Sequence, residues 1–121
     1  MRHAALTERI IGGFYDVYNA LGHGFLEKVY ENALSIALRR GKLSVLQQTP
    51  IKVQFEDEIV GEYFADLLVN GLVIVEIKAV ERLASTHEAQ LLNYLKATNI
   101  EVGLLLNFGP TPEVKRKALT N

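Results

Sequence analysis

Apolar residues recur at helical spacing in the first third of the chain. This spacing predicts a helix that starts at Thr7 as its N-cap and ends before Gly22, and its apolar positions are Ile10, Ile11, Phe14, Val17, Tyr18 and Leu21. The same spacing returns over residues 25–41, where two arginines precede Gly41. Basic residues in a last turn and a glycine after it are typical of a helix C-terminus, so a second helix is predicted there.

The pattern changes after residue 42. Residues 43–80 are rich in β-branched and aromatic residues and are interrupted by Pro50, an acidic turn at 56–58 and Asn70-Gly71, which predicts three antiparallel strands. Residues 85–98 are predicted to form a third, amphipathic helix, which opens with Ser85 and Glu88 in capping-box spacing. An apolar run at 101–109 predicts a strand covered on both faces. The tail at 111–121 is too short to assign, so the predicted order is α-α-β-β-β-α-β, an α/β mixed sheet with helices against it.

Composition restricts the class of protein. The 121 residues are 49% hydrophobic, with no Pro/Gly-rich or Ser-rich stretch, so we expect a single domain over 1–121. A net charge of -1 means that nucleic acid would meet a local basic patch. The absence of cysteine excludes disulfides and thiolate metal sites, and frequent charges near the N-terminus argue against a signal peptide or membrane span. A cytoplasmic protein is expected.

Two opposite charges interrupt the apolar segment GLVIVEIKAV at 71–80. Glu76 and Lys78 alternate with Val75 and Ile77, so the two charged residues share the face of the strand that is opposite the predicted core. An isolated ion inside a protein costs several kcal/mol unless it is paired or binds a metal. One interpretation is an edge strand with a solvated ion pair, and the other is a functional site.

The preceding segment contributes a second carboxylate, Asp66. A two-residue turn at Asn70-Gly71 would place Asp66 and Glu76 on different faces, whereas a three-residue loop with Gly71 in the left-handed conformation places them on one face. We predict the odd-numbered loop, Val69-Asn70-Gly71, which pairs Leu68 with Leu72. Two carboxylates on adjacent strands are suited to a hard divalent cation.

Two helix faces add further polar groups. One face of the predicted helix over 25–41 carries Glu27, Tyr30 and Glu31. The polar stripe of the third helix carries His87, Gln90 and Tyr94. Two of these residues have an alternative explanation: Glu27 as a first-turn acid favoured by the helix dipole, and Tyr30 as a core residue.

These motifs together resemble a known family. GFLEKVY at 24–30 is similar to the Gly-x-x-Glu-x-x-Tyr signature of the small prokaryotic GxxExxY proteins of the PD-(D/E)XK nuclease superfamily. Asp66 with Glu76-Ile77-Lys78 resembles the Asp…Glu-x-Lys core of that superfamily, although Ala65 replaces its proline. QLLNYL at 90–95 resembles the Gln-x-x-x-Tyr motif of RecB-like nucleases. Four motifs in this order are more specific than any one alone.

The resemblance implies a restriction-endonuclease-like fold and a Mg²⁺- or Mn²⁺-dependent deoxyribonuclease. It implies that Asp66, Glu76 and the Ile77 carbonyl hold the metal, and that Glu27 reaches the same ion or a second one. Lys78 would act on the attacking water or the phosphate. Gln90 would support the catalytic groups, and Tyr30, His87 and Tyr94 are the expected substrate contacts. DNA is the expected substrate, bound by a homodimer or by the nuclease subunit of a larger DNA repair or defence complex. The alternatives are a non-catalytic nucleic-acid-binding or protein-interaction module and a small-molecule or metal-storage protein.

Overall fold

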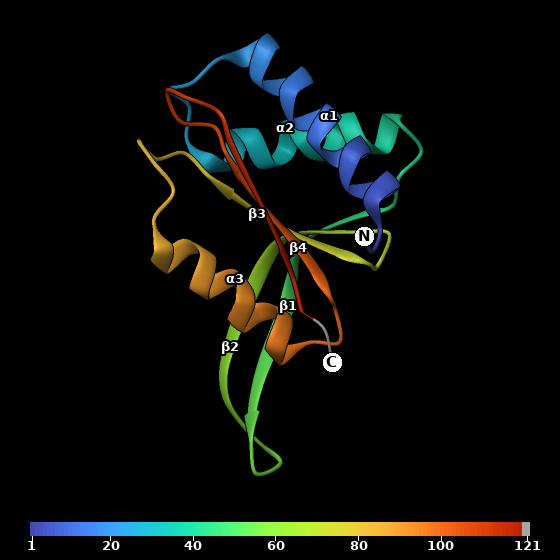
Figure 1. The fold of residues 1–121 in the computed structure, drawn as a ribbon, viewed down its shortest axis with the longest axis vertical. Helices are drawn as coiled ribbons and strands as arrows, with labels where there is room; N and C mark the ends of the chain where they lie inside the picture. Colours follow the sequence, from blue (N-terminus) through green and yellow to red (C-terminus); the bar gives the residue numbers. More distant parts are fainter. Residues whose placement is uncertain (120–121) are drawn as a thin grey trace.

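The structure is a computed structural model that describes residues 1–119, with helices on both faces of a five-stranded sheet (Figure 1). Its elements are α1 (Ala4–Leu21), α2 (Glu27–Arg40), β1 (Val45–Phe55), β2 (Glu58–Val69), β3 (Val73–Lys78), α3 (Ser85–Ala97), β4 (Val102–Asn107) and β5 (Glu113–Ala118). The strands lie in the order β1-β2-β3-β4-β5, and all neighbours are antiparallel except β3 and β4. The helix α3 connects this parallel pair. The predicted mixed α/β sheet is confirmed.

The structure corrects the predicted elements at three places. The tail that the sequence left unassigned forms β5, which pairs with β4 from Val102 opposite Ala118 onwards, while residues 120–121 of that tail lie outside the described part. The first helix begins at Ala4, so Thr7 is no N-cap and its hydroxyl instead donates to the Ala4 carbonyl at 3.0 Å. The third helix lacks the expected Ser85 cap, since Ala84 is its N-cap.

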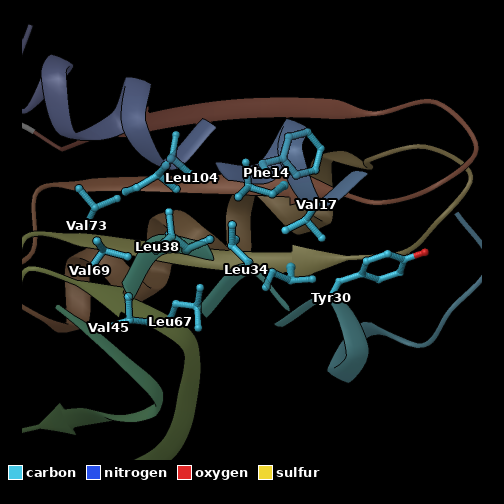
Figure 2. Close-up of a cluster of buried hydrophobic side chains, with 14 of the residues drawn as sticks. Phe14, Val17, Tyr30, Leu34, Leu38, Val45, Leu67, Val69, Val73 and Leu104 are labelled. Atoms are coloured by element: carbon cyan, nitrogen blue, oxygen red, sulfur yellow. The ribbon is translucent and has the colours of Figure 1, made fainter. Parts of the chain in front are cut away.

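The larger hydrophobic core lies between the sheet and the pair α1 and α2 (Figure 2). Alternate residues of β3 face it, as predicted, and the fully buried side chains include Ile10, Phe14, Tyr30, Leu34, Val73, Val75 and Ile77. Burying a side chain of this size contributes about 1.5–3 kcal/mol. These contacts therefore hold β3 firmly against the helix pair.

A smaller core lies on the opposite face, under α3. Leu91 and Leu95 of this helix pack with Ile74 and Leu105, which are the residues of β3 and β4 that alternate with the larger core. Both central strands are thus buried on two faces. The interpretation of residues 71–80 as an edge strand with a solvated ion pair is wrong, because β3 is the middle strand of five.

The hairpin of β1 and β2 projects from the sheet as a long arm beside α3 (Figure 1). Leu67 belongs to the larger core, whereas Ala65, two residues earlier, belongs to the smaller one, although a regular strand would place both on one face. Opposite this point, Gln48 of β1 has a φ of 53° and interrupts the ladder between Gln47 and Thr49. Both strands therefore rotate at Gln48 and Asp66. Among residues 1–119, no helix is long and apolar enough to span a membrane.

Candidate active site

The hairpin between β2 and β3 sets the position of the two predicted carboxylates. Its ladder pairs Leu68 with Ile74 and Val69 with Val73, so the loop has three residues, as predicted. The predicted pairing of Leu68 with Leu72 is wrong, because the loop is Asn70-Gly71-Leu72 and the register is shifted by two residues. A register shift of two residues leaves every side chain on the same face of the sheet. Asp66 and Glu76 therefore lie on one face, as the odd-numbered loop requires.

Where the β2–β3 ladder ends, the carboxylates of Asp66 and Glu76 accept backbone hydrogen bonds that carbonyl groups would accept in a regular ladder. The Asp66 N–H donates to Glu76 Oε2 at 2.8 Å, and the Ile77 N–H donates to Asp66 Oδ2 at 2.8 Å. Each side chain thus fixes the other strand. Because the N–H and C=O of one strand residue point to the same edge, the Ile77 carbonyl points toward Asp66 as well.

Burial makes this pair of carboxylates costly to ionise. Glu76 is only 4% exposed, and burial followed by the charge of Asp66 raises its pKa to about 8. Burial also raises the pKa of Asp66, with smaller contributions in the same direction from Glu31 and Glu27 that the bond from the Ile77 N–H opposes. The charge of Lys78 acts in the opposite direction on Glu76 but does not cancel the increase. Ionising both carboxylates would therefore leave more negative charge in the site than its surroundings balance.

Gln48 links this pair to the buried acid of α2. Its amide nitrogen lies 2.8 Å from Glu31 Oε1 and 3.3 Å from Asp66 Oδ1, and Gln47 donates to Glu31 Oε2 at 2.8 Å. A non-glycine residue in the left-handed region costs roughly 1–3 kcal/mol. These bonds hold Gln48 there, so its position beside Asp66 is built into the fold.

Sequence reasoning missed this network as part of the site. The helical spacing predicts that Glu31 shares a face with Glu27, but no motif in the sequence includes Gln47 or Gln48. The available signal was weak: two adjacent amides in a strand, where only one can point to each face. Their importance follows from the left-handed backbone of Gln48, which no residue pattern indicates.

Glu27, the first residue of α2, lies apart from the carboxylate pair. Within residues 1–119, no three His, Cys, Asp or Glu side chains gather closely enough to form a metal cluster. Glu27 is exposed, and its charge raises the pKa of both Asp66 and Glu76. It therefore faces the same region, and its role as a metal ligand stays a prediction.

Comparisons with known proteins identify the superfamily and a similar fold. The sequence matches the profile of the PD-(D/E)XK nuclease superfamily over residues 4–117. The chain belongs to this superfamily. Its fold is similar to the crystal structure of SSO0001, with a TM-score of 0.60 and 15% sequence identity over 78% of this chain and 51% of that one. The chain thus spans about half of that structure's length. No curated protein matches the sequence.

Lys78, the residue that the sequence predicts to be the lysine of the Asp…Glu-x-Lys series, ends β3. It is half-buried, and its ammonium makes no ion pair with the described residues. Its backbone carbonyl accepts from the Phe108 N–H at 2.8 Å, which anchors the end of the strand to the residue after β4. The lysine side chain is therefore held on a fixed backbone without a competing partner.

Tyr30 does not have the role that the resemblance implied. It is 0% exposed and stacks on Phe108 with ring centroids 4.3 Å apart, and Figure 2 shows it at the edge of the larger core. Its hydroxyl donates to the Gly22 carbonyl at 2.6 Å and accepts from the Phe25 N–H at 3.2 Å. Substrate contact by Tyr30 is a wrong prediction for this fold, because the ring is covered. The residue positions the loop that leads into α2 and Glu27.

The polar residues of α3 have different roles in the structure. His87 Nδ1 accepts from the Ala84 N–H at 2.9 Å, so His87 closes the first turn in place of the predicted Ser85–Glu88 box. Glu88 instead pairs with Lys117 of β5. Tyr94 is almost buried, and burial followed by the charges of Glu76 and Asp66 raises its pKa to about 12. Tyr94 thus lies close to the carboxylate pair.

Tyr94 and Gln90 also line a groove of about 580 Å³ between α3 and the β1–β2 arm. Gln90 is half-buried in this wall, which places it on the sheet side of α3. Contact of Gln90 with Glu76 or Lys78 stays a prediction, as does substrate contact by His87. Through Tyr94, the groove adjoins the catalytic candidates of this nuclease fold.

Proposed function

We propose that this chain is a Mg²⁺- or Mn²⁺-dependent nuclease that hydrolyses phosphodiester bonds in DNA. Within the superfamily, the Gly24…Glu27…Tyr30 series supports a place among the GxxExxY proteins. We place it in the cytoplasm as a single nuclease domain that works as a homodimer or as the nuclease subunit of a repair or defence complex.

The carboxylate pair, in which Glu76 is buried and Asp66 is partly buried, carries this proposal. Asp66 and Glu76 are bonded to each other's backbone, and burial together with mutual repulsion raises the pKa of Glu76 to about 8. Ionising both members of such a pair destabilises the fold unless a cation offsets the two charges. The described residues supply Lys78 as the nearby positive charge.

The donors present fit a hard divalent ion. Asp66 and Glu76 offer carboxylate oxygens, and the Ile77 carbonyl points to the same edge, which together make an oxygen ligand set of the kind that Mg²⁺ and Mn²⁺ prefer. Glu27 is the candidate for a further ligand. A bound ion would lower the pKa of a water molecule and offset charge on the phosphate.

The remaining residues act around the reacting phosphate. Lys78, free of an ion pair, is placed to orient the attacking water or to stabilise the charge that develops on the phosphoryl oxygens. The water oxygen forms a bond to phosphorus, the bond from phosphorus to the leaving sugar oxygen breaks, and a proton passes to that oxygen. Gln48 holds Asp66 and is therefore a positioning residue.

The test is hydrolysis of labelled single-stranded, duplex and branched DNA over a titration of Mg²⁺, Mn²⁺ and Ca²⁺. Lys78→Ala is expected to keep fold and metal affinity while hydrolysis falls by about 100-fold or more, because the lysine acts mainly in the transition state. Glu76→Ala is expected to lose metal binding as well. Lys115→Ala, on the exposed side of β5, is the matched control and should cleave like the parent.

Two results contradict the proposal. A parent protein that cleaves no DNA form with any of these ions is not a deoxyribonuclease, and a Lys78→Ala protein as fast as the parent removes Lys78 from the reaction. Binding of DNA without hydrolysis would instead support the non-catalytic module.

A further inference from the structure

The groove beside the carboxylate pair has a composition that sets it apart from the rest of this acidic chain. Ten residues line it, and none of them is acidic, although the chain has 14 Asp and Glu residues. Its walls are Val53, Gln54 and Tyr63 of the arm and Thr86, Ala89, Gln90, Asn93, Tyr94, Lys96 and Ala97 of α3. The amides, the hydroxyls and one ammonium make this surface suitable for a polar ligand with negative charge.

A second hollow continues this surface around the end of α3. It shares Gln54, Lys96 and Ala97 with the groove and adds Lys52, again without an acidic residue. From Gln90 to Ala97, the last residue of α3, the helix rises about 10 Å, which matches roughly three stacked nucleotides at 3.4 Å each. The path therefore leads from Tyr94, beside the carboxylate pair, to two lysines.

Tyr63 provides an aromatic face on this path. Its side chain is 48% exposed, and its ring lies 5.6 Å from that of Tyr94 at an angle of 41°. Contact with Tyr94 holds the ring in place while about half of it stays open. A rigid exposed ring next to a positive charge is a stacking platform for a nucleobase.

We propose that this groove binds single-stranded nucleic acid, with one base stacked on Tyr63 and the backbone near Lys96 and Lys52. The inference deepens the proposed nuclease function and rests on it for the direction of the strand toward Asp66 and Glu76. Duplex fits poorly for two reasons. Its bases are already stacked inside the helix and cannot stack on Tyr63, and its two strands of phosphates would meet only two lysines on this path.

The experiment measures the affinity of the whole chain for fluorescein-labelled dT8, rU8 and a hairpin duplex by anisotropy, in EDTA so that no hydrolysis occurs. Tyr63→Ala is expected to weaken dT8 binding about 5- to 150-fold, because base stacking on an aromatic ring has that value, while Tyr63→Phe retains binding. Lys96→Gln should reduce the slope of log K against log salt by about 0.7. Comparison of the affinities for dT8 and rU8 shows whether the groove distinguishes deoxyribose from ribose.

Phe64→Ala is the matched control. Phe64 follows Tyr63 on the other face of β2, is 46% exposed and does not line the groove, so its loss should leave dT8 affinity unchanged. Equal effects of Tyr63→Ala and Phe64→Ala, or duplex bound more tightly than dT8, would overturn the proposal. The binding assay needs no metal and no cleavage. A negative result in it therefore contradicts the groove proposal alone, and the nuclease proposal is tested separately by hydrolysis.

Discussion

Replacing Glu76 by glutamine should stabilise the metal-free protein at neutral pH. The substitution keeps the size of the side chain and an oxygen that accepts from the Asp66 N–H, a bond of 2.8 Å in the structure. It removes the ionisable group of Glu76, which is buried and whose ionisation the charge of Asp66 opposes. The folded state therefore no longer has to bear the cost of ionising position 76.

The pKa of Glu76 gives the size and the sign of the effect. Burial and Asp66 raise it from 4.5 to about 8, so between these values the folded protein holds a proton that the unfolded chain releases. The free energy of unfolding then falls as pH rises through that window, by about 3 kcal/mol at pH 7 and about 5 kcal/mol above pH 8. Below pH 4.5 this contribution to stability is fully present.

Thermal and urea unfolding in EDTA from pH 4.5 to 8.5 measure this difference. At pH 7, Glu76→Gln should be more stable than the parent by about 3 kcal/mol, which corresponds to a Tm about 10 °C higher for a domain of this size. The two proteins should converge near pH 4.5. Mg²⁺ should stabilise the parent, because a ligand that binds only the folded state shifts the equilibrium, and should leave the variant unchanged.

Glu62→Gln serves as the control, because Glu62 is an exposed acid of the same hairpin arm. Its unfolding curve should follow the parent at every pH. The reasoning is refuted if parent and Glu76→Gln differ by the same amount at pH 4.5 and pH 8, or if the variant is less stable at pH 8. Either result would mean that Glu76 is not held at a raised pKa by burial and Asp66.

Three further substitutions test the supports of the site. Gln48→Ala should weaken Mg²⁺ affinity about 10- to 100-fold in a calorimetric titration, because Asp66 loses a partner that orients it, and unchanged affinity would remove Gln48 from the site. Tyr30→Phe should lower the free energy of urea unfolding by about 1–3 kcal/mol, since the Gly22 carbonyl loses its donor; an unchanged value would contradict this role. Gly109→Ala should cost about 3 kcal/mol or more, because a Cβ there would lie 1.8 Å from the Val80 carbonyl oxygen, whereas Gly12→Ala, with open space around it, should not destabilise.

The sequence was most informative where one periodicity persisted over a long segment. The helix over 25–41 and the apolar strand at 101–109 were predictable, because each has a burial pattern that only one element satisfies. The strand β5 was not, because its residues are mostly charged and it is ordered by pairing with β4. Such tertiary pairing leaves no local pattern.

The same contrast explains the candidate site. Asp66 and Glu76 were found because side chains alternate along a strand, so an odd-numbered loop alone decides whether they meet. Gln48 was missed because it contributes through a left-handed backbone at the point where the arm turns, and a glutamine in a strand segment gives no sign of that conformation. Tyr30 was misassigned because a family signature identifies a residue without saying whether its ring is buried.

The rotation of β1 and β2 at Gln48 and Asp66 connects the proposed metal site with the proposed nucleic-acid groove. If β1 and β2 continued straight, Ala65 and Leu67 would share a face, and the outer arm would not lie against α3. Rotation at Gln48 and Asp66 both frees the Asp66 side chain from the regular ladder and carries Tyr63 to Tyr94. The same local distortion therefore produces the carboxylate pair and closes one wall of the groove, so a substitution that straightens the arm should impair metal binding and strand binding together.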